Sequence, residues 1–109
     1  MIARIWHGYT KAEDADAYAA KLKPELLPGI SKVPGYRGSY LLRRSNGSEV
    51  EFITIMIWDS IEAIRAVAGP KYEAAILQQD RLKYLVRYDT EVKHYEIAST
   101  HGVADLVTS

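Results

Sequence analysis

Two tryptophan-containing stretches of strand-forming residues, each followed by a helix-start signal, constrain the fold of this chain most strongly. Residues 2–9 precede Thr10 and Glu13, and residues 52–58 precede Asp59 and Glu62. In a capping box the first of these side chains accepts a hydrogen bond from a backbone amide three residues on, while the glutamate reaches back to the cap. The pattern therefore predicts a strand, a short turn and a helix, twice.

The remaining segments complete a regular order of predicted strands and helices. Strands are predicted over about 36–44 and 50–58, joined at Asn46-Gly47, a pair typical of tight hairpin turns. A second helix ends at Gly69-Pro70, a shorter helical piece carries Tyr72 and Gln79 on one face, and a last strand covers about 87–97. The order β-α-β-β-α-β predicts an α+β, ferredoxin-like antiparallel sheet in one domain, residues 1–98, followed by a tail, residues 99–109.

Composition excludes several classes of function. The chain has 109 residues, no cysteine and a formal net charge of zero, so disulfides, thiolate chemistry and a basic nucleic-acid surface are not expected. No apolar run approaches the roughly 20 residues that span a bilayer, and the N-terminal residues do not read as a secretion signal. We therefore expect a cytoplasmic protein with neither a nucleic-acid nor a membrane partner.

The third predicted strand is apolar on both of its faces. Ile53, Ile55 and Ile57 alternate with Phe52, Met56 and Trp58. Two small helices can cover only one face of a four-stranded sheet, and a half-exposed antiparallel strand normally alternates apolar with polar residues. The second face therefore needs another cover, and the sequence predicts a homodimer of stacked sheets.

The hairpin groups polar and aromatic side chains on one face. A two-residue Asn46-Gly47 turn places Ser45 opposite Ser48, and residues two apart along each strand then share a face. That face holds Arg37, Ser39, Thr54 and Trp58. A ligand cavity would use such a mixture, and so would the rim of a dimer interface.

Two histidines lie on the first and last predicted strands, which are antiparallel neighbours in this fold. If His94 faces Ile5, both His7 and His94 point to one face; a shift by one residue points them to opposite faces. The functional interpretation is an acid–base or substrate-binding pair, and the alternative is two histidines bonded to backbone or to carboxylates such as Glu91. Histidine and carboxylate spacing for a metal site is absent.

Four segments resemble the antibiotic biosynthesis monooxygenase family of the dimeric α/β-barrel superfamily. They are the opening Ile-Trp-His-Gly strand, residues 33–38, residues 57–63 and the closing residues 94–97. The resemblance covers about residues 2–98. It implies a ferredoxin-like dimer with a cavity between each sheet and its helices, binding a small molecule.

The resemblance also implies chemistry. Characterised members include oxygenases that need no cofactor, in which a substrate carbanion donates an electron to oxygen, and enzymes that degrade haem. The first activity, on a small aromatic or quinol-like substrate, implies His7 or His94 as the base, with Arg37, Trp58 and Tyr72 binding the substrate. A non-catalytic ligand-binding or stress-associated dimer is the alternative. Haem degradation is disfavoured, because His7, Ala66 and Ile76 replace the asparagine, tryptophan and histidine of the haem-degrading pattern.

Overall fold

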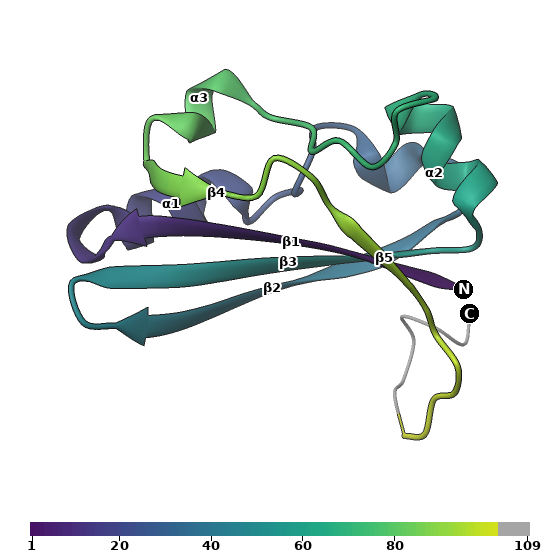
Figure 1. The fold of residues 1–109 in the computed structure, drawn as a ribbon, viewed down its shortest axis with the longest axis horizontal. Helices are drawn as coiled ribbons and strands as arrows, with labels where there is room; N and C mark the ends of the chain where they lie inside the picture. The colour runs from purple at the N-terminus through teal and green to yellow at the C-terminus, as the bar shows by residue number, and fades with distance from the viewer. Residues whose placement is uncertain (103–109) are drawn as a thin grey trace.

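The computed structural model describes residues 1–102 and contains one antiparallel sheet with helices on one side (Figure 1). Its elements in chain order are β1 (Ile2–Lys11), the 3₁₀ turn η1 (Ala12–Asp14), α1 (Ala15–Leu22), the 3₁₀ turn η2 (Ile30–Lys32), β2 (Tyr36–Asn46), β3 (Glu49–Trp58), α2 (Ile61–Ala68), α3 (Gln79–Leu82), β4 (Leu85–Tyr88) and β5 (Lys93–Glu96). Most of the predicted tail, residues 103–109, lies outside the described residues.

The sheet order is β2-β3-β1-β4, with β5 also paired to β1. This order confirms the predicted ferredoxin-like α+β fold, and the sheet is open rather than closed into a barrel. The predicted last strand is divided: β4 pairs with β1 around Gly8, whereas β5 pairs with Ile2 to Ile5. Residues 89–92 connect the two pieces.

Both helices begin later than the capping boxes predict. β1 runs through Thr10, whose buried hydroxyl donates to the Lys11 carbonyl, and α1 starts only after a 3₁₀ turn. At the second helix Ser60, rather than Asp59, is the N-cap, and its hydroxyl accepts from the Ala63 amide. Strand pairing continues past Thr10, which removes it from the cap position.

The hairpin turn lies one residue later than predicted. Asn46 pairs with Glu49, so the loop is Gly47-Ser48, with Gly47 at a left-handed φ of 67° that favours glycine. The pairing of Ser45 with Ser48 was wrong, since Ser45 pairs with Val50. This change slides the register by two residues. Because side chains alternate with a period of two, the predicted faces survive.

The chain between α2 and α3 is not helical. Residues 71–73 form a turn, Ala74 makes an isolated bridge to Glu91, and residues 75–78 have no regular structure. The predicted helical face of Tyr72 and Gln79 was therefore wrong. Backbone bonds between this segment and the 90–92 connection hold it over the sheet, including those from Ala75 to Thr90 and from Val92 to Glu73.

The hydrophobic core fills the space between the sheet and the helices. Phe52 is fully buried, Trp58 is 2% exposed, and Ile64 anchors α2 on them. The opposite face carries apolar side chains, and no helix of residues 1–102 lies over them. By register these are Ile5, Tyr9, Tyr40, Leu42, Ile53, Ile55 and Tyr95. We call this set the open face.

Candidate functional site

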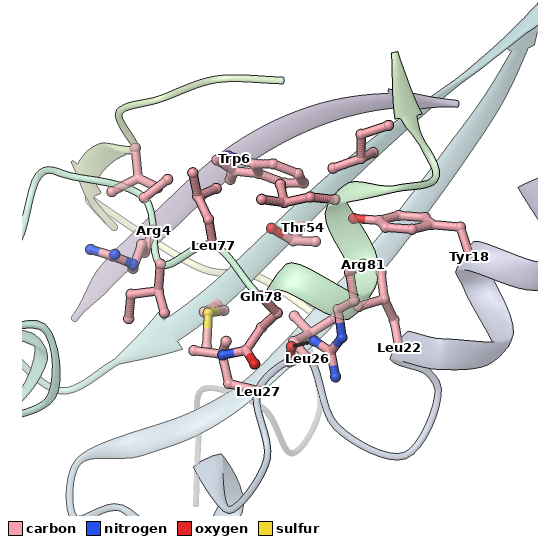
Figure 2. Close-up of a pocket in the computed structure, with 16 residues that line it drawn as sticks. Arg4, Trp6, Tyr18, Leu22, Leu26, Leu27, Thr54, Leu77, Gln78 and Arg81 are labelled. Atoms are coloured by element: carbon pink, nitrogen blue, oxygen red, sulfur yellow. Dashed lines mark hydrogen bonds between the residues drawn. The ribbon is translucent and has the colours of Figure 1, made fainter. Parts of the chain in front are cut away.

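A cavity of about 80 Å³ lies on the helix-covered face of the sheet. Trp6 and Thr54 are neighbours across β1 and β3 and form its floor, while Leu77 and Gln78 lie on the other side (Figure 2). Sixteen residues line it, and none is aspartate, glutamate or histidine. The lining is thus largely apolar with a few polar groups, as is usual for small-molecule sites.

Gly8 makes room for the Trp6 ring. A Cβ atom at Gly8 would lie 2.5 Å from Cη2 of Trp6, so the indole lies along the strand over the glycine backbone. The Trp6 Nε1 donates to the Asp89 carbonyl at 2.6 Å, which fixes the ring plane. The floor of the cavity is therefore a rigid aromatic surface whose polar edge is already satisfied.

Arg4 lines one end of the cavity and is only 6% exposed. Its Nη1 donates to the Tyr72 carbonyl at 2.6 Å and lies 2.8 Å from His94 Nε2, and its Nη2 donates to the Ala74 carbonyl at 3.3 Å. Burial lowers the pKa of Arg4, but a guanidinium remains charged in proteins. A buried positive charge thus ties β1 to the turn that precedes the cavity-covering segment.

Arg81 and Tyr18 contribute from the helices. Arg81 donates to the carbonyls of Leu26 and Lys21, and its buried Nε has no hydrogen-bond partner. Burial raises the pKa of Tyr18 to about 12, against an opposing effect of Arg81, so its phenol stays protonated at neutral pH. The cavity is lined by two guanidinium side chains and no carboxylate.

His94 is connected to the cavity only through Arg4. It pairs with Arg4 across β1 and β5, and its ring packs edge-on against Tyr72 at 5.3 Å between centroids. Both line a neighbouring hollow of about 320 Å³. Burial and then Arg4 lower the pKa of His94, while Glu73 opposes them. A neutral ring accepts the Arg4 N–H at Nε2 and carries its own proton on Nδ1.

His7 points to the other side of the sheet. Its neighbours across β3 and β1 place it with Ile53 and Ile5, on the open face, whereas His94 shares the helix-covered face with Arg4. The structure therefore has the second of the two registers left open by the sequence. His7 Nδ1 lies 3.1 Å from Asp89 Oδ2, and the same carboxylate oxygen accepts from the His7 amide.

Neither Arg37 nor Trp58 lines the cavity. A bulge between Tyr36 and Gly38 takes Arg37 out of the regular alternation, and its Nε forms an ion pair with Asp59 at 2.5 Å. Trp58 is in the core, edge-on to Tyr36 at 5.4 Å between centroids, and its buried Nε1 has no partner. The bulge also moves Tyr36 to the face of Trp58, against the predicted grouping.

Sequence reasoning missed most of the cavity. Thr54 belongs to the predicted polar and aromatic group and does line the cavity, whereas Arg4 and Trp6 from the sheet, Gln78 from the covering segment and Arg81 from α3 were not predicted. One signal was available for Arg4: it alternates with Trp6 and Gly8 on a strand that is otherwise apolar and aromatic. Residues that alternate along a strand point to the same face of the sheet. The charged Arg4 therefore lies on the same face as Trp6, which is the covered face.

Three solved structures show which known fold this is. An assigned antibiotic biosynthesis monooxygenase from Bacillus cereus aligns at a TM-score of 0.67 and 13% identity, covering 94% of this chain and 95% of that one. The haem degrader MhuD from Mycobacterium tuberculosis, with two haems bound in its active site, aligns at 0.61 and 20%, covering 94% and 100%.

SnoaB, a cofactor-independent oxygenase from Streptomyces nogalater, aligns at a TM-score of 0.53 and 14% identity, covering 94% of this chain and 98% of that one. This chain has the antibiotic biosynthesis monooxygenase fold. Identities this low show the fold alone. No protein-family model and no curated protein sequence matches the chain.

Over residues 1–102, no cluster of three or more histidine, aspartate or glutamate side chains is arranged to hold a metal ion. No helix within these residues has the length and apolar character needed to cross a membrane.

Proposed function

We propose that this protein is a small cofactor-independent monooxygenase that binds an aromatic or quinol-like molecule in the cavity over Trp6. The observation that carries the proposal is the cavity itself, with an indole floor, an apolar wall and the polar side chains of Thr54 and Gln78. The fold shared with SnoaB supports the oxygenase class.

The proposed chemistry needs no external reductant. An activated CH₂ group on the substrate loses a proton, the resulting carbanion donates an electron to O₂, and the carbon becomes a carbonyl while the second oxygen atom leaves as water. The residues around the cavity would hold the ring on Trp6, exclude water and stabilise the carbanion through the Arg4 charge. His94 is the proposed proton acceptor on this side of the sheet, and it can take a proton at Nε2 once the Arg4 N–H is released from that atom.

The cavity must enlarge to hold such a substrate. Its volume of about 80 Å³ is below the roughly 300 Å³ of ordinary ligand pockets. Residues 75–78 have no regular structure, and Ile76 and Leu77 are partly exposed at 38% and 36%. We propose that this segment moves outward when the ligand enters, because it has no regular structure whereas the floor of the cavity belongs to the sheet.

Oxygen uptake tests the proposal. Purified protein with a hydroxyanthrone, or with a naphthohydroquinone whose keto tautomer supplies the CH₂ group, should consume O₂ faster than the same compound in buffer, without added flavin or metal, and should give a product with one added oxygen atom. His94→Gln should lower the rate at least tenfold, a typical contribution of a proton acceptor, whereas His7→Gln, the matched change on the open face, should not. No consumption above buffer across both substrate types would reject the oxygenase.

A second function is favoured by one observation. The cavity lining contains no carboxylate or histidine that could act directly as a base, and the Nε2 of His94 is occupied by Arg4. A non-catalytic ligand-binding protein needs no base. Binding of these molecules without O₂ consumption would favour this function, and a Soret shift on titration with hemin would favour haem binding instead.

We also propose that two copies pair through the open face. Tyr40 and Leu42 are each 43% exposed there, and Tyr95 is 51% exposed. A contiguous apolar surface of this kind is uncommon on monomers. Sedimentation velocity at micromolar concentration should show a species of twice the chain mass, 12.3 kDa, and a monomer at that concentration would reject the pairing.

A further inference from the structure

The charge around the cavity is unbalanced. Arg4 and Arg81 both line it, neither forms an ion pair with a carboxylate of residues 1–102, and no lining residue is acidic. Ion pairs such as those of His7 with Asp89 and of Arg87 with Glu49 lie elsewhere and involve at least partly exposed side chains. A buried charge without a counter-charge is costly, so an anion that entered here would be strongly favoured.

Arg4 keeps donors available. A guanidinium has five N–H groups, and the contacts to Tyr72, His94 and Ala74 use both hydrogens of Nη1 and one of Nη2. The Nε–H and the second Nη2–H have no partner in the described chain. Each of these N–H groups can donate a charge-assisted hydrogen bond to an anionic oxygen.

The groups nearest to Arg4 do not replace an anion. His94 is neutral when it accepts from Nη1, and the other two partners are backbone carbonyls. Glu73 lines the neighbouring hollow and forms no ion pair with Arg4. The Arg4 charge is thus held by dipoles in a largely buried place, where the effective dielectric constant is below that of water.

We propose that the cavity selects an aromatic ring carrying an anionic oxygen, a carboxylate or a phenolate, with the ring on Trp6 and the oxygen at Arg4. The proposal rests on the ligand cavity of the proposed function but not on any turnover. It also deepens that function, since a site lined by guanidinium groups lowers the pKa of an ionising substrate and reduces the need for a protein base. Arg81 adds a second positive charge from α3.

Benzoate and benzamide, which have nearly the same shape but differ in charge, test this in the full chain. The ¹H–¹⁵N spectrum reports binding site by site, and the Trp6 indole N–H and the Gly8 amide should shift with either probe. Benzoate should bind roughly 10- to 100-fold more tightly than benzamide, the range of one charge-assisted pair. Equal affinities, tighter benzamide, no binding of either probe, or shifts confined to other regions would overturn the proposal.

Substitutions then assign the preference to Arg4. In Arg4→Met the ratio of the two affinities should fall to about one while benzamide affinity is kept, and Arg4→Lys should keep part of the preference. Arg81→Met should reduce the ratio less, and the exposed Arg44→Met should leave it unchanged. A ratio unaltered in Arg4→Met would reject the assignment.

The anion preference can be decided even if a variant fails to fold, because the comparison of benzoate with benzamide uses the wild-type protein. Phenol titrated above and below its own pKa separates the two anion sources, since only a phenolate site gains affinity as phenol ionises. Failure of oxygen uptake with tight benzoate binding would remove the oxygenase and keep the anion site. Oxygen uptake without a preference for benzoate would keep the oxygenase and remove the anion site.

Discussion

Each face of this sheet departs in its own way from what is expected of a sheet with one covered face. The covered face buries a charged side chain, Arg4, and a fully buried hydroxyl, Thr10, beside its aromatic core. The open face presents Ile53, Ile55 and Leu42 instead. Burying polar groups and exposing apolar ones both cost free energy unless each has a purpose. This difference is the one expected if the proposed ligand site lies on one face and the proposed contact between two copies on the other.

Adjacent residues on β3 give the largest expected difference between the faces. Phe52→Ala should lower the free energy of unfolding by about 3–5 kcal/mol, because the ring is fully buried in the core. Ile53→Ala should lower it by roughly 1 kcal/mol in dilute protein, since that side chain is only partly buried. Urea denaturation followed by circular dichroism measures both.

Measurements of both variants at several protein concentrations sharpen the comparison between Phe52 and Ile53. The Phe52→Ala loss should not depend on concentration, whereas the Ile53→Ala loss should grow as the proposed dimer forms. Losses at both positions that stay equal and independent of concentration would remove the distinction between the faces.

A charge placed at the centre of the open face should give the next largest effect. Ile55→Glu should weaken self-association by about 100-fold, roughly 3 kcal/mol, because an unpaired carboxylate would be desolvated between two sheets. Sedimentation equilibrium measures the change, with Ala17→Glu on the exposed side of α1 as the control. Unchanged association in Ile55→Glu would place the contact elsewhere.

Substitutions at the start of α2, the helix that covers Trp58, test which residue is its N-cap. Ser60→Ala should cost about 1 kcal/mol, because the Ala63 amide loses its acceptor. Asp59→Ala, the change that the sequence alone marks as the cap, should cost less, since Asp59 forms only a half-exposed ion pair with Arg37. Thermal unfolding of the two variants should rank them in this order, and the reverse order would restore Asp59 as the cap.

The smallest expected effect concerns His94, the histidine on the covered face. The folded-state pKa of His94 is lowered, so the unfolded chain binds its proton more readily. This contribution to stability is complete above the unfolded pKa of about 6.5 and is lost as the pH falls through the lower folded value. His94→Gln should therefore flatten the decline in unfolding midpoint between pH 8 and pH 5, and an unchanged pH profile in this variant would contradict it.

The fold could be predicted because its signals are local and periodic. The apolar run over residues 52–58, rich in β-branched residues, and the turn near Asn46 locate strands without reference to distant residues. The error of two residues in the hairpin register did no harm to the predicted faces, because it was an even number. The bulge at Arg37 was invisible, since it depends on how β2 meets the end of β3.

The candidate site was harder to predict, because contacts far apart in sequence create it. Arg4 and His94 meet only through the β1–β5 register, and one residue of shift would have separated them. The covering segment, residues 75–78, was predicted as part of a helical piece but has no regular structure, so the position of Gln78 could not be predicted. A charged residue inside an apolar strand was the available clue to Arg4, and its alternation with Trp6 was the means of placing it.

The division of the last strand into β4 and β5 has an evolutionary consequence. The connection at residues 89–92 sets which side chains of β5 lie on the covered face beside the proposed ligand cavity, independently of β4. Loss or gain of one residue there would exchange His94 for Tyr95 or Lys93 beside Arg4, while the Trp6 floor stayed in place. A change of length in a surface connection would thus alter ligand selection in one step, without any substitution in the cavity.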